Sequence, residues 1–421
     1  MGFSSCQQDD EGLPAGERPD ERLDATLTEY KSKLVSAANG WKGVLYTGTG
    51  GAYNFYFVFF ENDRVTMYSD IDATTASVPM ESTYRMKAMQ TPSLLFDTYS
   101  YIHILSDPDP SKNGGIEGAG KVSDFIFSID SVAENSMELI GNFNGTRLVL
   151  EEASQEESQN FMPGIAENLV AFEHINNFKT YFKRLTFDEQ EFDLTVNTNY
   201  REITFSYFTG NALNSFTTNY YYSPDGLVLV DPFVLNEITI SKLQGLQYNS
   251  QSSTITFTEN GAPGSIQSVV QPIAIDLNAA QRFYFSPANG TYWVTDNGFT
   301  IEGEPDALGV GAMANFAFST FWPEYGQSEG VTYDLFGFII EDAGGLFISG
   351  GPALVPEFTN DGRLIFHFLG TLGEILPEDE AVFLATTEIF ADPDGFYVIQ
   401  TSQQSYDLVS ANDATKWISF F

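Results

Sequence analysis

The chain has 421 residues and a formal net charge of −38, from 57 acidic and 19 basic side chains. This charge repels phosphate backbones and anionic lipid surfaces, which argues against nucleic acid as a partner and against direct electrostatic adhesion to a membrane. A single cysteine excludes an intrachain disulfide, and no run reaches the roughly 18 apolar residues of a membrane-spanning helix.

The only cysteine, Cys6, follows Phe3-Ser4-Ser5 and precedes the acidic run Gln7-Gln8-Asp9-Asp10-Glu11. Small residues before a lone cysteine are typical of the end of a bacterial lipoprotein signal, although the basic and apolar segments of a full signal are absent from Met1–Ser5. The pattern predicts a lipid on Cys6 and anchoring to a membrane. Two alternatives stay open: acylation of Gly2 with a thioester lipid on Cys6, and an idle cysteine in a frayed terminus.

Residues 7–20 are polar, contain Gly and Pro, and are predicted to form a flexible spacer. A helix is expected next, because apolar residues recur at helical spacing after Asp20, a good N-cap. Gly40 would supply its left-handed stop. Trp41, directly after this stop, is expected to plug one end of the domain that follows.

Short alternating runs then predict antiparallel strands. In Tyr53–Phe60 both faces are apolar, so this strand is expected to be covered on both sides, and Phe125–Ile129 alternates as well. Turns with primed geometry are predicted where an Asn or Asp precedes Gly. The pairs are Asn144-Gly145, Asp225-Gly226, Asn297-Gly298, Asp361-Gly362 and Asp394-Gly395.

A long helix is predicted within residues 154–184, where seven apolar residues recur at helical spacing and Pro163 would occupy the first turn. A short helix is also expected near Ala307–Phe318. The predicted fold is mainly β: an antiparallel, meandering, barrel-like (lipocalin-like) N-terminal unit with an opening helix, a linking helix, and a second mostly β unit. The predicted domains are a tether over 1–20, a first domain over 21–183 and a second over 184–421, with a further division possible near 278.

Few residues suggest a metal or cofactor site. The three histidines, His103, His174 and His367, are far apart and are each expected to be partly buried structural residues. Oxygen donors alternate in one loop, at Asp107, Asp109 and Asn113, as they do in calcium sites, so calcium is retained as an option. The loop lacks the glycine and the closing glutamate of an EF-hand, and no other cofactor is predicted.

No nucleophile elbow or phosphate-binding loop is present, so no catalytic residue is predicted. Two facing carboxylates would suffice for a glycosidase, and a chain this acidic leaves that option open. Exposed aromatic rings can stack on sugars or flat cofactors, and the candidates for ligand binding are Trp293, Trp322 and Tyr221.

Several short motifs make the chain resemble an uncharacterised family of Bacteroidota outer-membrane lipoproteins, domain of unknown function 4302. They are Glu17-Arg18, Glu21-Arg22, Gly40-Trp41, Val65–Asp70, Leu95-Phe96-Asp97, Ser123-Asp124-Phe125 and Lys416-Trp417-Ile418. The resemblance covers nearly the whole chain and assigns no catalytic residue. It implies that the acidic run after Cys6 directs the protein to the cell exterior.

The family's setting, beside a TonB-dependent transporter and a starch-utilisation-type binding lipoprotein, implies an accessory role in capture or uptake. The expected function is therefore a surface-tethered, non-enzymatic accessory or binding lipoprotein of a nutrient-uptake system, anchored in the outer membrane. Two alternatives are kept: a hydrolase of glycans or peptides that uses unidentified carboxylates, and a carrier of a small hydrophobic or haem-like ligand inside a barrel.

Overall fold

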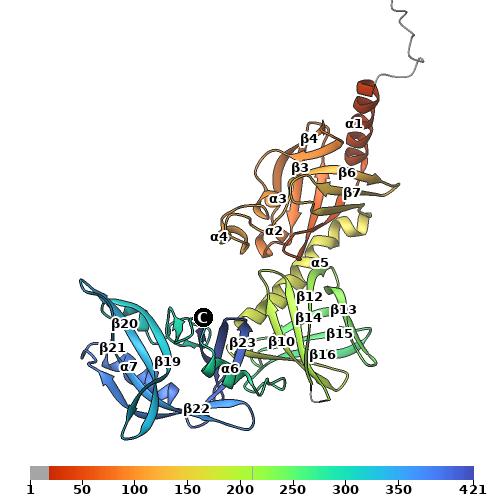
Figure 1. The fold of residues 1–421 in the computed structure, drawn as a ribbon. Coiled ribbons are helices and arrows are strands. Elements are labelled where there is room, and N and C mark those ends of the chain that lie inside the picture. Colours follow the sequence, from red (N-terminus) through yellow and green to blue (C-terminus); the bar gives the residue numbers. More distant parts are fainter. Residues whose placement is uncertain (1–18, 211) are drawn as a thin grey trace, which may run out of the picture. The chain divides into compact units, whose positions relative to one another are not determined.

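The computed structural model describes residues 19–210 and 212–421. It confirms a mainly β, antiparallel protein, with two closed eight-stranded barrels and a nine-stranded sheet (Figure 1). The chain clusters into two compact units. The first extends to Leu169 and includes the later segments 199–201 and 219–225, and the second contains the rest.

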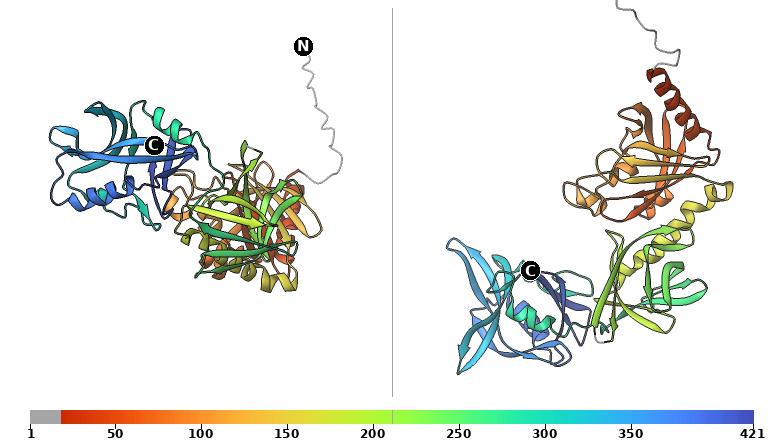
Figure 2. Two further views of the ribbon diagram at one scale, coloured as in Figure 1. Left: turned by 90° about the horizontal axis from the view of Figure 1, so that it is seen from below. Right: turned by 45° about the vertical axis from the view of Figure 1, so that its right-hand side comes forward.

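The first barrel is a meander in which each strand pairs with the next and β8 pairs with β1. Its strands are β1 (Trp41–Tyr46), β2 (Ala52–Phe59), β3 (Arg64–Ser69), β4 (Met80–Ala88), β5 (Pro92–Phe96), β6 (Ile126–Val132), β7 (Ser136–Gly141) and β8 (Arg147–Glu152). Three short helices lie in its connections: α2 (Ala73–Ser77), α3 (Tyr101–Ile104) and α4 (Pro110–Asn113). The opening helix, α1 (Pro19–Ser36), packs against β2, β4 and β5 (Figure 2).

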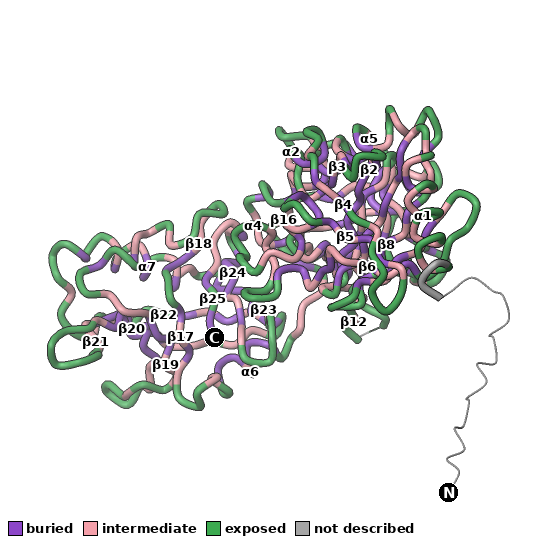
Figure 3. The backbone as a smooth tube through the Cα atoms, turned by 90° about the horizontal axis from the view of Figure 1, so that it is seen from above, coloured by how far each residue is buried: buried purple, intermediate pink, exposed green. Residues whose placement is uncertain are grey.

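Alternation along the strands fills this barrel with aromatic side chains. Phe55 and Phe57 of β2 are buried inside with ring centroids 5.2 Å apart, and Tyr56 on the opposite face is buried as well. The prediction that both faces are covered is therefore confirmed from Tyr53 to Phe57, where Figure 3 shows buried residues along β2. It does not hold at the end of the run, where Val58 is only partly buried and Phe60 is exposed. Trp41 is also buried, as expected, and its indole N–H donates to the Leu34 carbonyl at 2.9 Å, which joins α1 to the barrel core.

The ends of α1 differ from the prediction. The helix begins at Pro19, so Asp20 lies in its first turn instead of capping it, and it ends at Ser36. Gly40 has the expected left-handed backbone, with φ +74°, and a Cβ there would lie only 2.6 Å from the Phe57 carbonyl oxygen. The glycine is thus required where the chain turns into β1, four residues after the helix.

The linking helix is shorter than predicted. α5 (Gln155–Glu173) and one 3-10 turn, η1 (His174–Asn177), occupy the range, and β9 begins at Phe182. Phe178 and Phe182 are four residues apart, a spacing that one helix face and one strand face both satisfy, which explains the error. The helix starts early because Ser154 and Glu157 form a reciprocal capping box, with N–H···O distances of 3.2 and 2.9 Å.

This early start places Pro163 in the helix interior, not in the first turn as predicted. Proline has no N–H to donate to the carbonyl of Gln159 and its ring crowds that carbonyl. Because Pro163 is exposed, we expect Pro163→Ala to raise the free energy of unfolding of the first unit by about 1–3 kcal/mol. Urea denaturation would measure this, with Glu156→Ala as the neutral control. An unchanged or lowered stability would show that the helix is adapted to its proline.

Four of the five predicted glycine turns are confirmed in position, but none of these four has the predicted type. Three of the predicted pairs join neighbouring strands and the fourth precedes β23: Asn144-Gly145, Asp225-Gly226, Asp361-Gly362 and Asp394-Gly395. In none of them does the Asn or Asp have positive φ, so the expected primed geometry is wrong. Asn297-Gly298 is not a hairpin, because the strands on either side of it, β17 and β18, pair with β19 and β25.

The second barrel is again a meander, closed by pairing between β16 and β9. Its strands are β9 (Phe182–Phe187), β10 (Gln190–Asn197), β11 (Glu202–Thr209), β12 (Ala212–Ser223), β13 (Gly226–Leu235), β14 (Ile238–Asn249), β15 (Thr254–Glu259) and β16 (Ala262–Val269). Asp188 and Glu189, between β9 and β10, both have positive φ, so the primed backbone occurs at a turn that contains no glycine.

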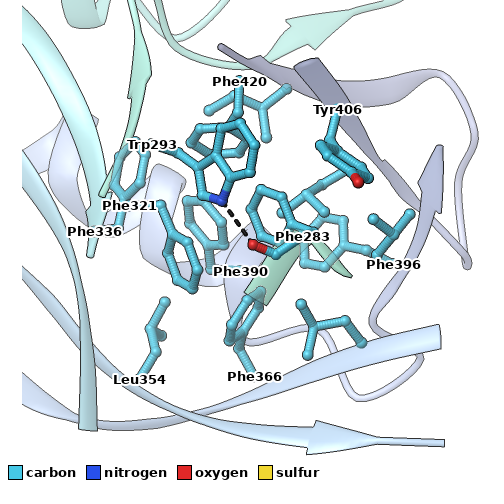
Figure 4. Packing of buried hydrophobic residues seen from close by; sticks show 14 of the residues in the cluster. Phe283, Trp293, Phe321, Phe336, Leu354, Phe366, Phe390, Phe396, Tyr406 and Phe420 are labelled. Carbon is cyan, nitrogen blue, oxygen red and sulfur yellow. Dashed lines mark hydrogen bonds between the residues drawn. The ribbon is translucent and has the colours of Figure 1, made fainter. Parts of the chain in front are cut away.

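The nine-stranded sheet completes the second unit. Its strands are β17 (Trp293–Thr295), β18 (Thr300–Ile301), β19 (Phe316–Ser328), β20 (Val331–Asp342), β21 (Gly345–Phe358), β22 (Arg363–Gly373), β23 (Phe396–Ser402), β24 (Ser405–Ser410) and β25 (Lys416–Phe420). Its core is a cluster of aromatic rings around Phe283 and Trp293 (Figure 4).

The helices of this region differ from the prediction. In place of the helix expected near 307–318 there is only a 3-10 turn, η2 (Val310–Ala312), and the sequence patterns missed α6 (Ala279–Phe285) and α7 (Glu380–Phe390). In the described part of the chain, no helix has the length and apolarity needed to span a membrane.

Candidate ligand-binding cavity

A cavity of about 320 Å³ lies on the outer surface of the first barrel, within the first unit. Since the odd-numbered residues of β1 face the core, the even-numbered ones point outward, and their partners on β8 do the same. Three cross-strand pairs form the floor: Lys42 with Glu151, Val44 with Val149, and Tyr46 with Arg147. The volume is at the lower end of the roughly 300–1,000 Å³ of small-molecule sites.

The walls come from three other segments. Phe161 of α5 lies on one side, Asn54 comes from β2, and residues 221–224 supply the rest of the lining. Tyr221, predicted from the sequence as a ligand-binding residue, belongs to this last segment. Burial, and next the nearby Tyr46, raise the pKa of Tyr221, so its hydroxyl remains a protonated donor at neutral pH.

One end of the cavity is charged. The Lys42 ammonium lies 2.6 Å from a carboxylate oxygen of Glu157 and 3.4 Å from one of Glu151, and 5.9 Å from the centre of the Phe161 ring. The hydrogen bond from Lys42 lowers the pKa of Glu157 to about 2. Glycosidases need a carboxyl group of raised pKa as their acid, so Glu157 does not fit that role in the hydrolase alternative.

The opposite end is aromatic. The Arg147 guanidinium lies 5.6 Å from the centre of the Tyr46 ring and donates to Glu138. The cavity thus combines a pair of valines at the centre of its floor with two tyrosine rings and planar polar groups. Such a lining can take a small ligand that presents a flat apolar face and several hydrogen-bonding groups.

A buried ion pair fixes the wall formed by residues 219–225. Arg201 and Asp70 are both almost fully buried, with 3.1 Å between Nη1 and Oδ2. The guanidinium also lies 4.0 Å from the centre of the Tyr53 ring and 4.9 Å from that of Tyr222. Asn54 completes the contact, because its amide donates to Asp70 at 2.6 Å and to the Tyr222 carbonyl at 2.8 Å.

The two predicted tryptophans belong to the second unit, and neither of them lines this cavity. Trp293 is buried in the core of the nine-stranded sheet, where its indole N–H donates to the Phe283 carbonyl at 2.8 Å (Figure 4). Trp322 is partly exposed, with its ring centre 5.1 Å from that of Tyr292 and 5.4 Å from that of Tyr325. The structure therefore places Tyr221, Trp293 and Trp322 in three separate surroundings.

The predicted calcium loop is braced by its own backbone. Asp107 accepts from the Asp109 N–H at 3.0 Å and from the Tyr99 hydroxyl at 2.6 Å. Asp109 accepts from the Ser111 N–H, and Asn113 from the Gly115 N–H, at 3.0 and 2.7 Å. Within residues 19–210 and 212–421, no three His, Cys, Asp or Glu side chains are grouped to hold a metal ion.

The three histidines differ in their exposure to solvent. His103 and His174 are partly buried, as expected, but His367 is exposed and contacts Glu357 at 2.7 Å, because it points outward from β22. Cys6 lies outside the described residues.

Four residues of the cavity and its supporting wall were not predicted from the sequence: Lys42, Tyr46, Arg147 and Arg201. The alternation in β1 marks the first two as outward-facing, but nothing local shows what covers them.

Comparison with known proteins identifies a family but no activity. A family model described as "Domain of unknown function (DUF4302)" matches residues 16–299, which include both barrels and the cavity. The match ends before most of the nine-stranded sheet, so it is shorter than the resemblance seen in the sequence. No curated protein matches.

One solved structure that the chain is similar to has a different description. It is the "Structure of DNA polymerase III subunit beta from Borrelia burgdorferi in complex with a natural product", at 8% identity over 95% of this chain and 96% of that one. Its TM-score of 0.14 is too low to carry an argument about fold or function.

Proposed function

We propose that this chain, which belongs to the DUF4302 family of domains of unknown function, is a non-enzymatic binding protein whose ligand site is the cavity beside β1 and β8. The observation that supports this most is the lining itself, in which tyrosine rings and planar charged groups surround the valine pair of the floor. A buried ion pair holds one wall in place, and such preorganisation lowers the cost of binding.

We further propose that the protein is attached to the outer membrane through lipid on Cys6, facing the cell exterior. The support is the motif around Cys6 and the resemblance to Bacteroidota lipoproteins. In this setting the protein would serve as an accessory component of a nutrient-uptake system, beside a TonB-dependent transporter and its binding lipoprotein. A strongly acidic surface is compatible with this position, because the tether is covalent and needs no attraction to lipid.

The binding role can be tested by filling the cavity. Val44 is a partly exposed residue of the floor, and Val44→Trp would occupy the space without touching the barrel core. We expect small molecules that co-purify with the natively expressed protein, identified by mass spectrometry, to be lost in this variant and reduced about tenfold in Tyr221→Ala. Val132→Trp, on β6 and outside the lining, is the matched control. Equal ligand recovery from all four proteins would refute this site.

A further inference from the structure

A second concavity, of about 720 Å³, lies on the outer surface of the first barrel over β6. Ser128 and Ile140, opposite each other on β6 and β7, form part of its floor. The turn between β4 and β5 and the turn between β7 and β8 form its sides, and they approach each other where the Asn142 amide lies 3.5 Å from the Met89 sulfur. None of its lining residues belongs to the cavity described above.

A buried carboxylate holds one of these turns from beneath. Asp124 accepts the backbone N–H groups of Phe143, Asn144 and Thr146 at 2.9, 3.0 and 3.2 Å, and the Thr146 hydroxyl at 2.7 Å. Gly141 permits this arrangement, since a Cβ there would lie 2.0 Å from the Asp124 carboxylate. Four hydrogen bonds to one buried charge make the turn rigid.

The rigid turn presents an unusually exposed ring. Phe143 is 74% exposed, the highest value among the exposed large hydrophobic residues of the described chain. Met89, across the concavity, is 46% exposed. A large apolar ring on a fixed backbone loses little conformational entropy when it is covered, which is the property of a binding contact.

The remaining lining is polar without being acidic. Among the described residues that line this concavity there is no Asp or Glu, and Lys87 is the only charged one, in a chain of net charge −38. Gln90 and Asn142 carry amides, each of which can both donate and accept, as neighbouring sugar hydroxyls do. Phe143 and Met89 offer an apolar surface for the C–H face of a sugar ring.

We propose that this concavity is a saccharide-binding site in which Phe143 stacks on a sugar ring and the Gln90 and Asn142 amides bind its hydroxyls. Because the lining lacks acidic groups, the site accepts acidic sugars as well as neutral ones, with Lys87 facing their carboxylate. The proposal is independent of the function proposed above, since the two sites share no residue.

Met89 provides a direct reporter for the test. The full chain, labelled with ¹³C in its methionine methyl groups, would be titrated with maltohexaose and with hexagalacturonate, and the Met89 signal followed by NMR. We expect saturable shifts with at least one probe. Phe143→Ala should weaken binding about three- to tenfold, and Lys87→Met should weaken only hexagalacturonate, by about tenfold.

Phe60→Ala is the matched control, because Phe60 is an exposed phenylalanine of the same unit that lies outside the lining. Its affinities should equal those of the unaltered protein. The proposal is overturned if neither probe shifts the Met89 signal, or if the shifts persist unchanged in Phe143→Ala while that variant remains folded.

Discussion

Replacing Arg201 by alanine is expected to destabilise the first unit by about 3–5 kcal/mol, the usual cost of removing one partner of a buried ion pair. Asp70 is fully buried, and Arg201 is its cationic partner. The variant would leave the Asp70 charge in a low-dielectric setting with only the hydrogen bonds from Asn54. It would also remove the cation between the Tyr53 and Tyr222 rings.

Hydrogen exchange measured on peptides of β2 and β3 would report this loss within the first unit, without assuming that the whole chain unfolds in one step. Adding Asp70→Asn to Arg201→Ala should recover a large part of the loss, because it removes the unpaired charge. Arg85→Ala is the matched control: Arg85 pairs with Asp97 on the surface, where such a pair contributes about 0–1 kcal/mol. A cost below about 1 kcal/mol for Arg201→Ala would contradict the role given to this pair.

Replacing Asp334 by asparagine is expected to stabilise the second unit at neutral pH, in contrast to most substitutions of buried residues. Asp334 is fully buried in β20. One carboxylate oxygen accepts from the Tyr284 hydroxyl at 2.7 Å and from the Glu324 N–H at 2.9 Å, while the other has no partner among the described residues. Burial raises the pKa of Asp334 to about 6.

The sign of the pH dependence follows from this raised pKa. Below about pH 4 the carboxyl is protonated in both folded and unfolded chains and carries no penalty. As the pH rises from about 4 to about 6, the unfolded chain releases this proton while the folded chain still holds it. The free energy of unfolding therefore falls by about 3 kcal/mol over this range and stays level above it. Asp334→Asn should therefore gain about 3 kcal/mol over the unaltered protein at pH 7.5 and nothing at pH 4.

Hydrogen exchange of β20 peptides at the two pH values would measure this difference. Tyr284→Phe serves as the opposite control, because it removes a donor to the carboxylate and should lower stability at pH 7.5. If Asp334→Asn changed stability equally at pH 4 and pH 7.5, the residue would not be the source of the pH dependence.

Local patterns predicted the first barrel well. Alternation in β2 and β6, and the Asn-Gly turn between β7 and β8, each depend on neighbours in the sequence, and together they indicate an antiparallel meander. The errors arose where a local signal fits two structures. The spacing of Phe178 and Phe182 suits a helix and a strand alike, and the Asn297-Gly298 pair bends the chain without joining two paired strands.

The cavity could not be predicted in the same way. Its floor depends on closure of the barrel, which brings Lys42 beside Glu151 and Tyr46 beside Arg147, about a hundred residues apart in the chain. The wall formed by residues 219–225 depends on Arg201, and no periodic pattern in the sequence indicates that Arg201 is buried. Tyr221 was selected because alternation in a run of three tyrosines must turn at least one ring away from the core. Trp293 was selected only as a ring that can stack on a ligand, and it is buried.

Both the lipid tether and the binding role can be examined in one experiment, affinity purification of the tagged, natively expressed protein from detergent-solubilised outer membranes. Mass spectrometry would then identify the lipid, the small molecules and the proteins that accompany it. We predict a lipid on Cys6, a bound small molecule that Val44→Trp abolishes, and co-purification of a transporter with its binding lipoprotein. Recovery of the protein alone, without lipid on Cys6 and without a ligand, would show that it is neither tethered in this way nor a binding protein of this kind.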